Sequence, residues 1–271
     1  MNIYAVTVTI IYIINIIIVT GLVFLKRKDV KSTMEWILIF MLFPLVGYIF
    51  YLFIGSTTKF KILSKKYSIK KLEEGYRQVL KENIENIEKG DAALAPDFAD
   101  MIEFNARNAG GIYSTDNDVT LFTGAKEKYE RMFEEIENAK ESINVLYFII
   151  KTRDDIGKKF IALLAKKARQ GVEVRLIYDR LGEMKNSRRD FKELINAGGM
   201  VYSFLPSSFG TLLQANYRMH RKIVIIDGLV AYTGGINIGD DYLGLDPRVH
   251  PWRDSAVRIV GSAVHSVQMR F

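Results

Sequence analysis

The sequence of 271 residues contains no cysteine and only three histidines, His220, His250 and His265. The absence of cysteine excludes a disulfide-stabilised scaffold, a cysteine-ligated zinc or iron–sulfur site, and catalysis by a thiol. Three histidines scattered along the chain do not suggest a metal site built from several imidazoles. We therefore expect no metal ion and no other cofactor.

Acidic and basic side chains are missing from two long stretches near the N-terminus, residues 1–25 and residues 36–54. Because about 20 apolar residues span the hydrocarbon core of a bilayer as a helix, they predict a membrane hairpin of two transmembrane helices within residues 1–55. A cleaved signal peptide, the alternative for the first stretch, would begin with basic residues. The alternative for the second is a buried core helix, which is rarely apolar all round for five turns. Pro44 and Gly47, inside it, are tolerated in membrane helices.

Basic residues flank the second apolar stretch on both sides. Four lie between residues 26 and 31, and six lysines lie between residues 59 and 71. A hairpin would place the N-terminus and everything after residue 55 on the same side of the membrane. Since the larger basic cluster follows the hairpin, the positive-inside rule favours the cytoplasm for that side. We therefore expect a multi-pass protein of the cell membrane whose catalytic domain is cytoplasmic.

Residues 56–111 predict a basic, helical juxtamembrane linker. Its segment 59–89 carries nine lysines and arginines against five acidic residues. This composition is typical of a solvated amphipathic helix. Beside anionic lipid, basic residues would also each gain about 1 kcal/mol. The stretch could thus hold the following domain against the headgroups.

Residues 112–271 alternate between strand-like and helix-like patterns. Such alternation predicts an α/β layered domain with a mixed, largely parallel sheet flanked by helices. The strands expected before residue 215 lie at 119–122, 142–150, 172–178 and 200–205. The helices expected between them lie at 126–140, 155–170 and 188–197.

Residues 219–244 concentrate polar side chains around a predicted strand, turn and strand. His220 and Lys222 are two positions apart, so on a strand they project to the same face. The dipeptide Asp227-Gly228 is a turn signal between the apolar runs 223–226 and 229–233. Asp227 has the opposite parity from Lys222 and could order this hairpin without touching a substrate.

A pair of glycines and an amide follow the second of these strands. Gly234 and Gly235 permit close backbone approach, and Asn237 offers two amide donors. An imidazole, an ammonium group and an amide on one face are a set suited to binding a phosphate. A lone histidine or a single Asp-Gly turn is usually structural. The fixed order His-x-Lys-x4-Asp-x6-Gly-Gly-x-Asn, in contrast, indicates a functional site.

This order resembles the signature of the phospholipase D superfamily, and the chain is most similar to bacterial cardiolipin synthases within it. The resembling phrases lie at residues 43–55, 171–182, 216–228, 233–244 and 252–264. The resemblance implies a phospholipase D-type layered domain in residues 112–271. It also implies catalysis without a metal.

The resemblance further implies a two-step transfer in which one histidine attacks phosphorus and a second protonates the leaving alcohol. It assigns His220, Lys222 and Asp227 to the catalytic motif, with His220 as the nucleophile that becomes a phosphohistidine. Lys222 and Asn237, with Gly234 and Gly235, would bind the phosphate oxygens.

Asp254 occupies the place of an acidic residue that often orients the histidine in this superfamily. A structural ion pair of Asp254 with its neighbour Arg253 is the alternative to that orienting role.

Members of this superfamily carry two such motifs, whereas this sequence has one. His250 and His265 lack a lysine two residues later, and we interpret both as structural. Residues 112–271 are therefore expected to be the first of two domains, awaiting a second phospholipase D half. The other possibility is that two copies of the chain pair their motifs across a two-fold axis.

The sequence thus predicts a cardiolipin synthase-like phosphatidyl transferase that joins two phosphatidylglycerol molecules and releases glycerol. One alternative is a membrane-anchored phosphodiesterase or nuclease that acts as a homodimer. Another is an inactive membrane module that binds lipid or another chain. Nucleic acid is not the expected partner, because the positive excess of the chain lies largely beside the predicted membrane segments.

Overall fold

The computed structural model describes residues 3–25, 30–51, 70–89, 96–180, 182, 186–204, 218–246 and 252–271. The chain divides into two compact units, of which the second comprises Lys70–Ser207 and Asn216–Phe271. His250, the basic residues 26–28 and most of the lysine cluster at 59–71 lie outside the described residues.

The described part of the N-terminal unit contains three helices, α1 (Ile3–Leu25), α2 (Val30–Leu42) and α3 (Pro44–Phe50). The buried Asn15 of α1 donates a hydrogen bond of 3.1 Å from its Nδ2 to the carbonyl oxygen of Phe40 in α2. Pro44 begins α3, as proline at a first helical position commonly does.

The second apolar stretch is therefore divided between two helices. No helix in the described part of the chain meets the length and hydropathy needed to cross a membrane. The expected pair of transmembrane helices stays a prediction.

The second unit opens with a pair of helices, α5 (Lys70–Glu88) and α6 (Ala99–Ala109), with the short η3 (Pro96–Phe98) before α6. Ile87 and Ala106 form the buried contact between them. Asn83 fastens the chain that follows, because its Oδ1 accepts from the backbone N–H of Tyr113 and its Nδ2 donates to the carbonyl of Tyr113. The charged segment predicted to be helical thus packs against α6 through an apolar side.

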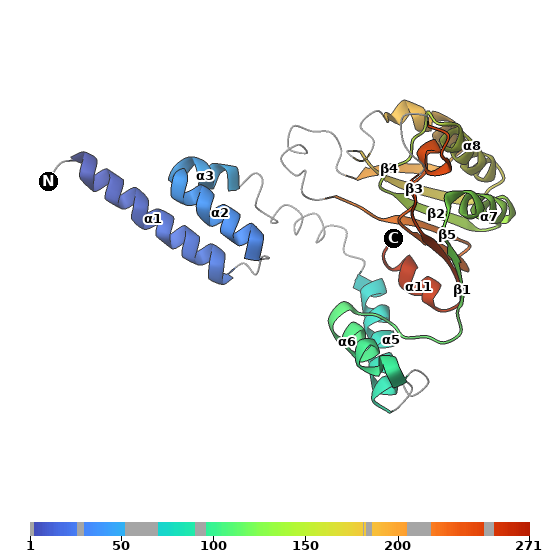
Figure 1. Cartoon of the computed structure of the whole chain (residues 1–271), viewed down its shortest axis with the longest axis horizontal. Helices are drawn as coiled ribbons and strands as arrows, with labels where there is room; N and C mark the ends of the chain where they lie inside the picture. Colours follow the sequence, from blue (N-terminus) through green and yellow to red (C-terminus); the bar gives the residue numbers. More distant parts are fainter. Residues whose placement is uncertain are drawn as a thin grey trace. The chain divides into compact units, whose positions relative to one another are not determined.

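A seven-stranded sheet in the order β1-β7-β6-β5-β2-β3-β4 forms the centre of this unit (Figure 1). Its strands are β1 (Asp118–Phe122), β2 (Ser142–Tyr147), β3 (Glu173–Asp179), β4 (Met200–Phe204), β5 (Lys222–Ile226), β6 (Val230–Gly234) and β7 (Ala256–Val260). The strands expected from the sequence are present, whereas β7 was not predicted.

The sheet is mixed, as expected, but the prediction that it is largely parallel is wrong. Only β2–β3 and β3–β4 pair in parallel, while the four other neighbouring pairs are antiparallel. The helical crossovers that parallel pairing requires connect β2, β3 and β4. A three-residue turn, residues 227–229, joins β5 to β6, and so short a connection permits only antiparallel pairing.

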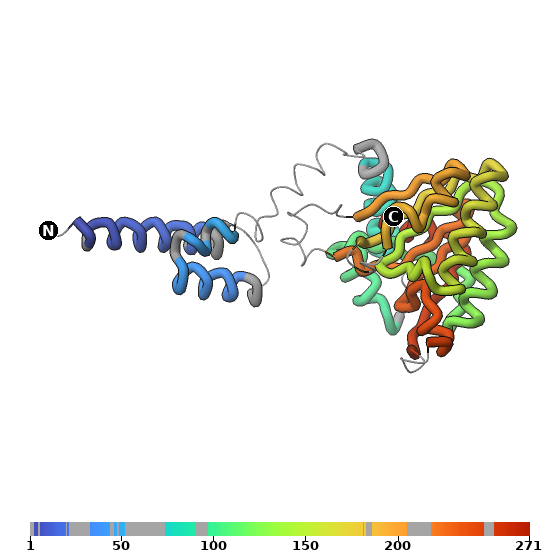
Figure 2. Tube along the Cα trace, turned by 90° about the horizontal axis from the view of Figure 1, so that it is seen from above, coloured from blue at the N-terminus to red at the C-terminus, as the bar shows by residue number. Residues whose placement is uncertain are grey.

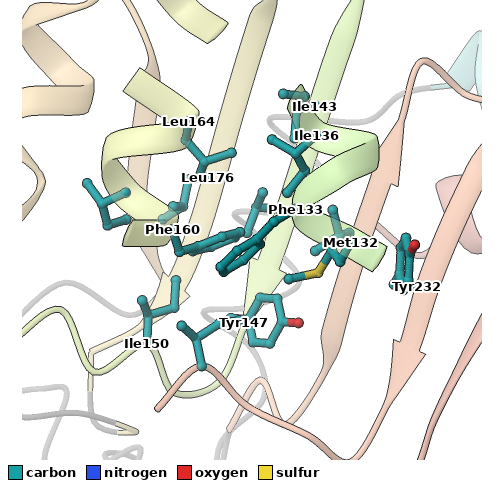
Figure 3. Close-up of a cluster of buried hydrophobic side chains, with 14 of the residues drawn as sticks. Met132, Phe133, Ile136, Ile143, Tyr147, Ile150, Phe160, Leu164, Leu176 and Tyr232 are labelled. Atoms are coloured by element: carbon teal, nitrogen blue, oxygen red, sulfur yellow. The ribbon is translucent and has the colours of Figure 1, made fainter. Parts of the chain in front are cut away.

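Helices cover both faces of the sheet, as Figure 2 traces at right angles to the first view. One face packs against α7 (Ala125–Asn138), α8 (Asp155–Arg169) and the short pair η4 (Arg188–Phe191) and α9 (Lys192–Asn196). In this core the rings of Phe133 and Phe160 stack at 5.8 Å between centroids (Figure 3).

The other face of the sheet forms a smaller apolar cluster with α11 (Ala263–Gln268). Val264 of α11 is fully buried there. The chain that enters β5 also contributes Met219 to this cluster, so this face helps to hold the segment just before β5 in place.

Candidate active site

His220 and Lys222 meet where the chain enters β5. The Nζ of Lys222 lies 3.0 Å from the Nε2 of His220, which confirms the prediction that both side chains project to one face. The side chain of His220 is exposed, whereas Lys222 retains only 4% of its exposure. An exposed imidazole thus stands in front of a largely buried cation.

Phe148, which follows β2, is a third member of the site, and sequence reasoning did not identify it. Its backbone N–H donates to the carbonyl of Arg221 at 3.0 Å and thereby continues the pairing of β2 with β5. Its ring meets the ring of His220 at 4.6 Å between centroids and lies 5.2 Å from the Nζ of Lys222. Phe148 thus limits the positions available to both polar side chains, and its π face favours the cation.

Burial and one carboxylate set the charge at Lys222. Burial lowers the pKa of Lys222, and the nearby negative charge of Asp254 opposes that shift. The Oδ1 of Asp254 accepts a hydrogen bond of 2.7 Å from the backbone N–H of Ser255. Between these described residues no hydrogen bond joins Asp254 to His220 and no ion pair joins it to Arg253. The orienting role of Asp254 stays a prediction.

The two glycines after β6 permit close contacts beside this pair. A Cβ on Gly235 would lie 1.9 Å from the Oδ1 of Asp254, and a Cβ on Gly234 would lie 2.5 Å from the Cα of Ala256. Gly235 therefore leaves room for the carboxylate, and Gly234 leaves room for β7. The proposed contact of these glycines with phosphate stays a prediction.

Asn237 is buried and holds the segment that carries Phe148. Its Oδ1 accepts from the backbone N–H of Ile149 at 3.2 Å, and its Nδ2 donates to the hydroxyl of Tyr242 at 2.7 Å. The hydroxyl of Tyr129 donates to its carbonyl oxygen. These contacts indicate a positioning role, and direct binding of phosphate by Asn237 stays a prediction.

Asp227 follows β5 at the end opposite to Lys222, and its assignment to the catalytic group stays a prediction. Its carboxylate accepts three hydrogen bonds of 2.8–2.9 Å from the backbone N–H groups of Lys140, Glu141 and Ser142. Its φ of 52° and the φ of 67° at Gly228 are those of a type I′ turn. The parity argument from the sequence, which placed Asp227 at the turn, is confirmed.

Replacing Asp227 with asparagine is expected to lower the free energy of unfolding by about 1–2 kcal/mol, because hydrogen bonds to a charged acceptor become bonds to a neutral one. Burial raises the pKa of this carboxyl, but the three backbone donors hold it below its ordinary value. The stabilisation is therefore present above the unfolded-state pKa and is lost as pH falls through the lower folded-state pKa. Denaturant unfolding of both proteins at pH 7 and below pH 4 should show that the variant and the wild type differ less in free energy of unfolding in acid. A large loss of catalytic rate per folded molecule would contradict a structural role.

A pocket of about 610 Å³ opens at His220 and Lys222. Its polar and basic lining includes Arg221, Thr233, Ser266 and Arg270 in addition to this pair. The Nη1 of Arg221 donates at 2.6 Å to the carbonyl of Arg270, which ties the chain after α11 to the entry of β5. Sequence reasoning missed both arginines, although Arg221 lies inside the motif. The pocket combines one imidazole with several cations, which suits an anionic substrate.

His265 lies on α11 with an exposed side chain and is not among the residues that line this pocket. The interpretation of His265 as structural agrees with this position. Within the described residues, the pocket contains one histidine.

Comparisons with known proteins give a consistent family. Residues 132–247 match the model of the family described as cardiolipin synthase, PLD-like domain. The chain is 37% identical over 276 residues to the major cardiolipin synthase ClsA of Bacillus subtilis, covering 100% of this chain and 57% of that protein. It is 35% identical to a cardiolipin synthase of Oceanobacillus iheyensis, covering 96% of this chain and 54% of the relative. The chain thus spans about half the length of the curated relatives that it matches.

Among solved structures, NucT from Helicobacter pylori matches with a TM-score of 0.44 and 14% identity, over 57% of this chain and 93% of that chain. The phosphatidylserine synthase of Haemophilus influenzae matches with the same TM-score and 15% identity, over 56% of this chain and 35% of that one. The chain is thus similar to the PLD-like domain of bacterial cardiolipin synthases over residues 132–247, and similar to named cardiolipin synthases over about half of their length.

Proposed function

We propose that this chain acts in phosphatidyl transfer, joining two phosphatidylglycerol molecules into cardiolipin with release of glycerol. The observation that carries the proposal is the imidazole of His220, 3.0 Å from the ammonium of Lys222, at a basic pocket within the PLD-like domain. The relatives with 33–37% identity that bear the name cardiolipin synthase support the choice of substrate.

In the proposed first step, the imidazole of His220 attacks the phosphorus of one phosphatidylglycerol. A nitrogen–phosphorus bond forms, the bond from phosphorus to the glycerol oxygen breaks, and glycerol leaves after taking up a proton. Lys222 stabilises the negative charge on the phosphate oxygens during this step. In the second step, a hydroxyl of another phosphatidylglycerol attacks the phosphohistidine, loses its proton, and frees His220.

The general acid that protonates glycerol is proposed to come from a second phospholipase D half or from a second copy of the chain. Within the described residues, the pocket supplies one histidine, and a two-step exchange of this kind needs a base and an acid. A two-fold arrangement would bring two such pockets together.

We further propose that the N-terminal unit holds the domain at the cell membrane as a multi-pass anchor, with the domain on the cytoplasmic side. Apolar side chains cover α1, and Ile3 and Ile17 retain 83% and 66% of their exposure. Exposed apolar surface of this extent is typical of a protein that contacts another apolar phase. A lipid substrate in the same bilayer would then be concentrated near the pocket.

Product analysis tests the proposed reaction. The purified full chain in detergent micelles is supplied with phosphatidylglycerol, and mass spectrometry measures cardiolipin and free glycerol. We expect the two products in equal amounts. Because the chain spans about half the length of its relatives, a second arm adds the C-terminal half of the Bacillus subtilis relative.

Three outcomes would contradict the proposal. Phosphatidic acid in place of cardiolipin would show that water is the acceptor. Cleavage of an oligonucleotide under the same conditions, without lipid turnover, would favour a nuclease. The absence of products in both arms would favour an inactive membrane module.

A further inference from the structure

Lys128 of α7 is a buried lysine that the proposed reaction does not use. Its side chain retains 1% of its exposure, and its Nζ donates a hydrogen bond of 2.7 Å to the hydroxyl of Tyr147. The ring centroids of Tyr129 and Tyr147 lie 4.9 and 5.2 Å from the same nitrogen. In the described part of the chain, no carboxylate forms an ion pair with it. A buried ammonium without a carboxylate is costly, so its position calls for a reason.

The position of Lys128, on α7 and behind the candidate phosphate site, supplies that reason. Lys128 and Lys222 line the same narrow cavity, together with Tyr147, Tyr232 and Gly234. Tyr147 of β2 is the direct neighbour of Lys222 in the register of β2 with β5. The cavity has no room for a water molecule. Any electrical interaction between the two amines is therefore little screened.

The three tyrosines around Lys128 stay uncharged near neutral pH. Burial raises the pKa of Tyr129, of Tyr147 and of Tyr232 far above its ordinary range. On the same helix, Glu135 accepts a hydrogen bond from the hydroxyl of Tyr232 and forms an ion pair with Arg258. Burial lowers the pKa of Lys128 to about 7, and burial also lowers that of Lys222. Two amines, and the carboxylate of Asp254 that acts on Lys222, thus control the charge of this interior.

We propose that Lys128 is a positioning residue for the phosphate site, which takes up a proton from solvent when an anionic phosphate binds beside Lys222. The inference rests on the proposed function, since it requires that the pocket binds phosphate. In the empty site, the charge of Lys222 opposes a second ammonium behind it. A bound phosphate cancels that repulsion and favours the charged form of Lys128.

The proton ends on the Nζ of Lys128, which then donates to the hydroxyl oxygen of Tyr147. A second positive charge behind Lys222 strengthens the field on the phosphate without contact between Lys128 and the substrate. By linkage, protonation of Lys128 and binding of phosphate must favour each other to the same degree. Lys128 thus gains its positive charge only when the phosphate site is occupied.

Nuclear magnetic resonance of the full chain in detergent, with ¹³C at the Cε of lysine, measures this proton directly. The Lys128 signal is assigned from its loss in Lys128→Arg, and Lys126, which is exposed on the same helix, is the internal control. The probe is dimethyl phosphate, whose single negative charge does not change between pH 5 and pH 11. We expect Lys128 to titrate well below Lys126 in the free protein.

Two changes should each raise the titration midpoint of Lys128 by about one unit or more. One is saturation with dimethyl phosphate, and the other is Lys222→Met without ligand, which removes the repelling charge. The midpoint of Lys126 should stay fixed in both. The affinity of the wild type for dimethyl phosphate should fall about tenfold between pH 6 and pH 9. In Lys128→Met the affinity should no longer fall over the pH range in which Lys128 loses its proton.

Two contrary outcomes are possible, and they contradict different claims. The inference would be overturned if the titration midpoint of Lys128 changed neither in Lys222→Met nor with bound dimethyl phosphate. It would also be overturned if that midpoint equalled the midpoint of Lys126. If saturating dimethyl phosphate leaves the ring signals of His220 unchanged, the phosphate site itself is contradicted, and the proposed function fails with it. The response to Lys222→Met separates these two failures, because it needs no ligand.

Discussion

Replacing His220 with alanine is expected to lower the rate of phosphatidyl transfer by at least about 10³-fold, because the variant lacks the group that carries the covalent intermediate. The stability of the chain should change little. The side chain of His220 is exposed, and its partners are the ring of Phe148 and the amine of Lys222. Surface substitutions of this kind usually change the free energy of unfolding by less than about 0.5 kcal/mol.

The matched control is His265→Ala, which removes an exposed imidazole from α11 outside the lining of the pocket. Its rate should stay within about twofold of the wild type. Rapid acid quenching of the wild type with labelled phosphatidylglycerol should trap lipid on the protein, and the His220→Ala variant should trap none. A His220→Ala variant that keeps a tenth of the wild-type rate would remove the imidazole from the role of nucleophile.

The pairing of His220 with Lys222 was predictable because it depends on local geometry. Alternate residues of a strand share a face, and this rule needs no knowledge of the remaining sheet. The turn at Asp227-Gly228 was predictable for the same reason, since both residues tolerate positive φ. The family resemblance added a catalytic role for Asp227, which stays a prediction, whereas its carboxylate accepts hydrogen bonds at the start of β2. The parity of the residue along the strand was the better guide to its position.

Phe148 was not predictable from local patterns, because it reaches the site only through the pairing of β2 with β5, about 75 residues apart in the sequence. The direction of the strands was missed for a related reason. Helices between strands predicted parallel pairs, and the rule fails where β5, β6 and β7 follow without such helices. Long-range register is what the sequence patterns did not contain.

Lys128 carried a local signal that the sequence analysis did not use. It lies one residue before Tyr129 and four before Met132, so it falls on the apolar side of the predicted helix. A lysine at such a position usually extends its charged end to water. Here the packing of α7 on β2 places Tyr147 over it instead, and only the structure shows that contact.

Replacing Gly234 with alanine is expected to lower the free energy of unfolding more than any other change discussed above. Its φ of 145° is costly for a residue with a Cβ, by about 1–3 kcal/mol. The added Cβ would also lie 2.5 Å from the Cα of Ala256 and from the carbonyl oxygen of Ser255. Both are backbone atoms, one in the paired strand β7 and one in the residue just before it, so relief requires movement of a strand, and overpacking of this kind costs about 1–3 kcal/mol more.

Gly171→Ala separates the two costs, because Gly171 has a φ of 91° but a Cβ there would meet no atom within 4 Å. Denaturant unfolding of the full chain, followed by tryptophan fluorescence, should therefore show a loss for Gly171→Ala from backbone strain alone and a clearly larger loss for Gly234→Ala. Equal losses would show that β6 does not approach β7 so closely. Because Gly234 lines the pocket and β7 begins two residues after Asp254, the same displacement should also weaken binding of dimethyl phosphate beside Lys222. The close approach of the two strands would then be part of what forms the phosphate site.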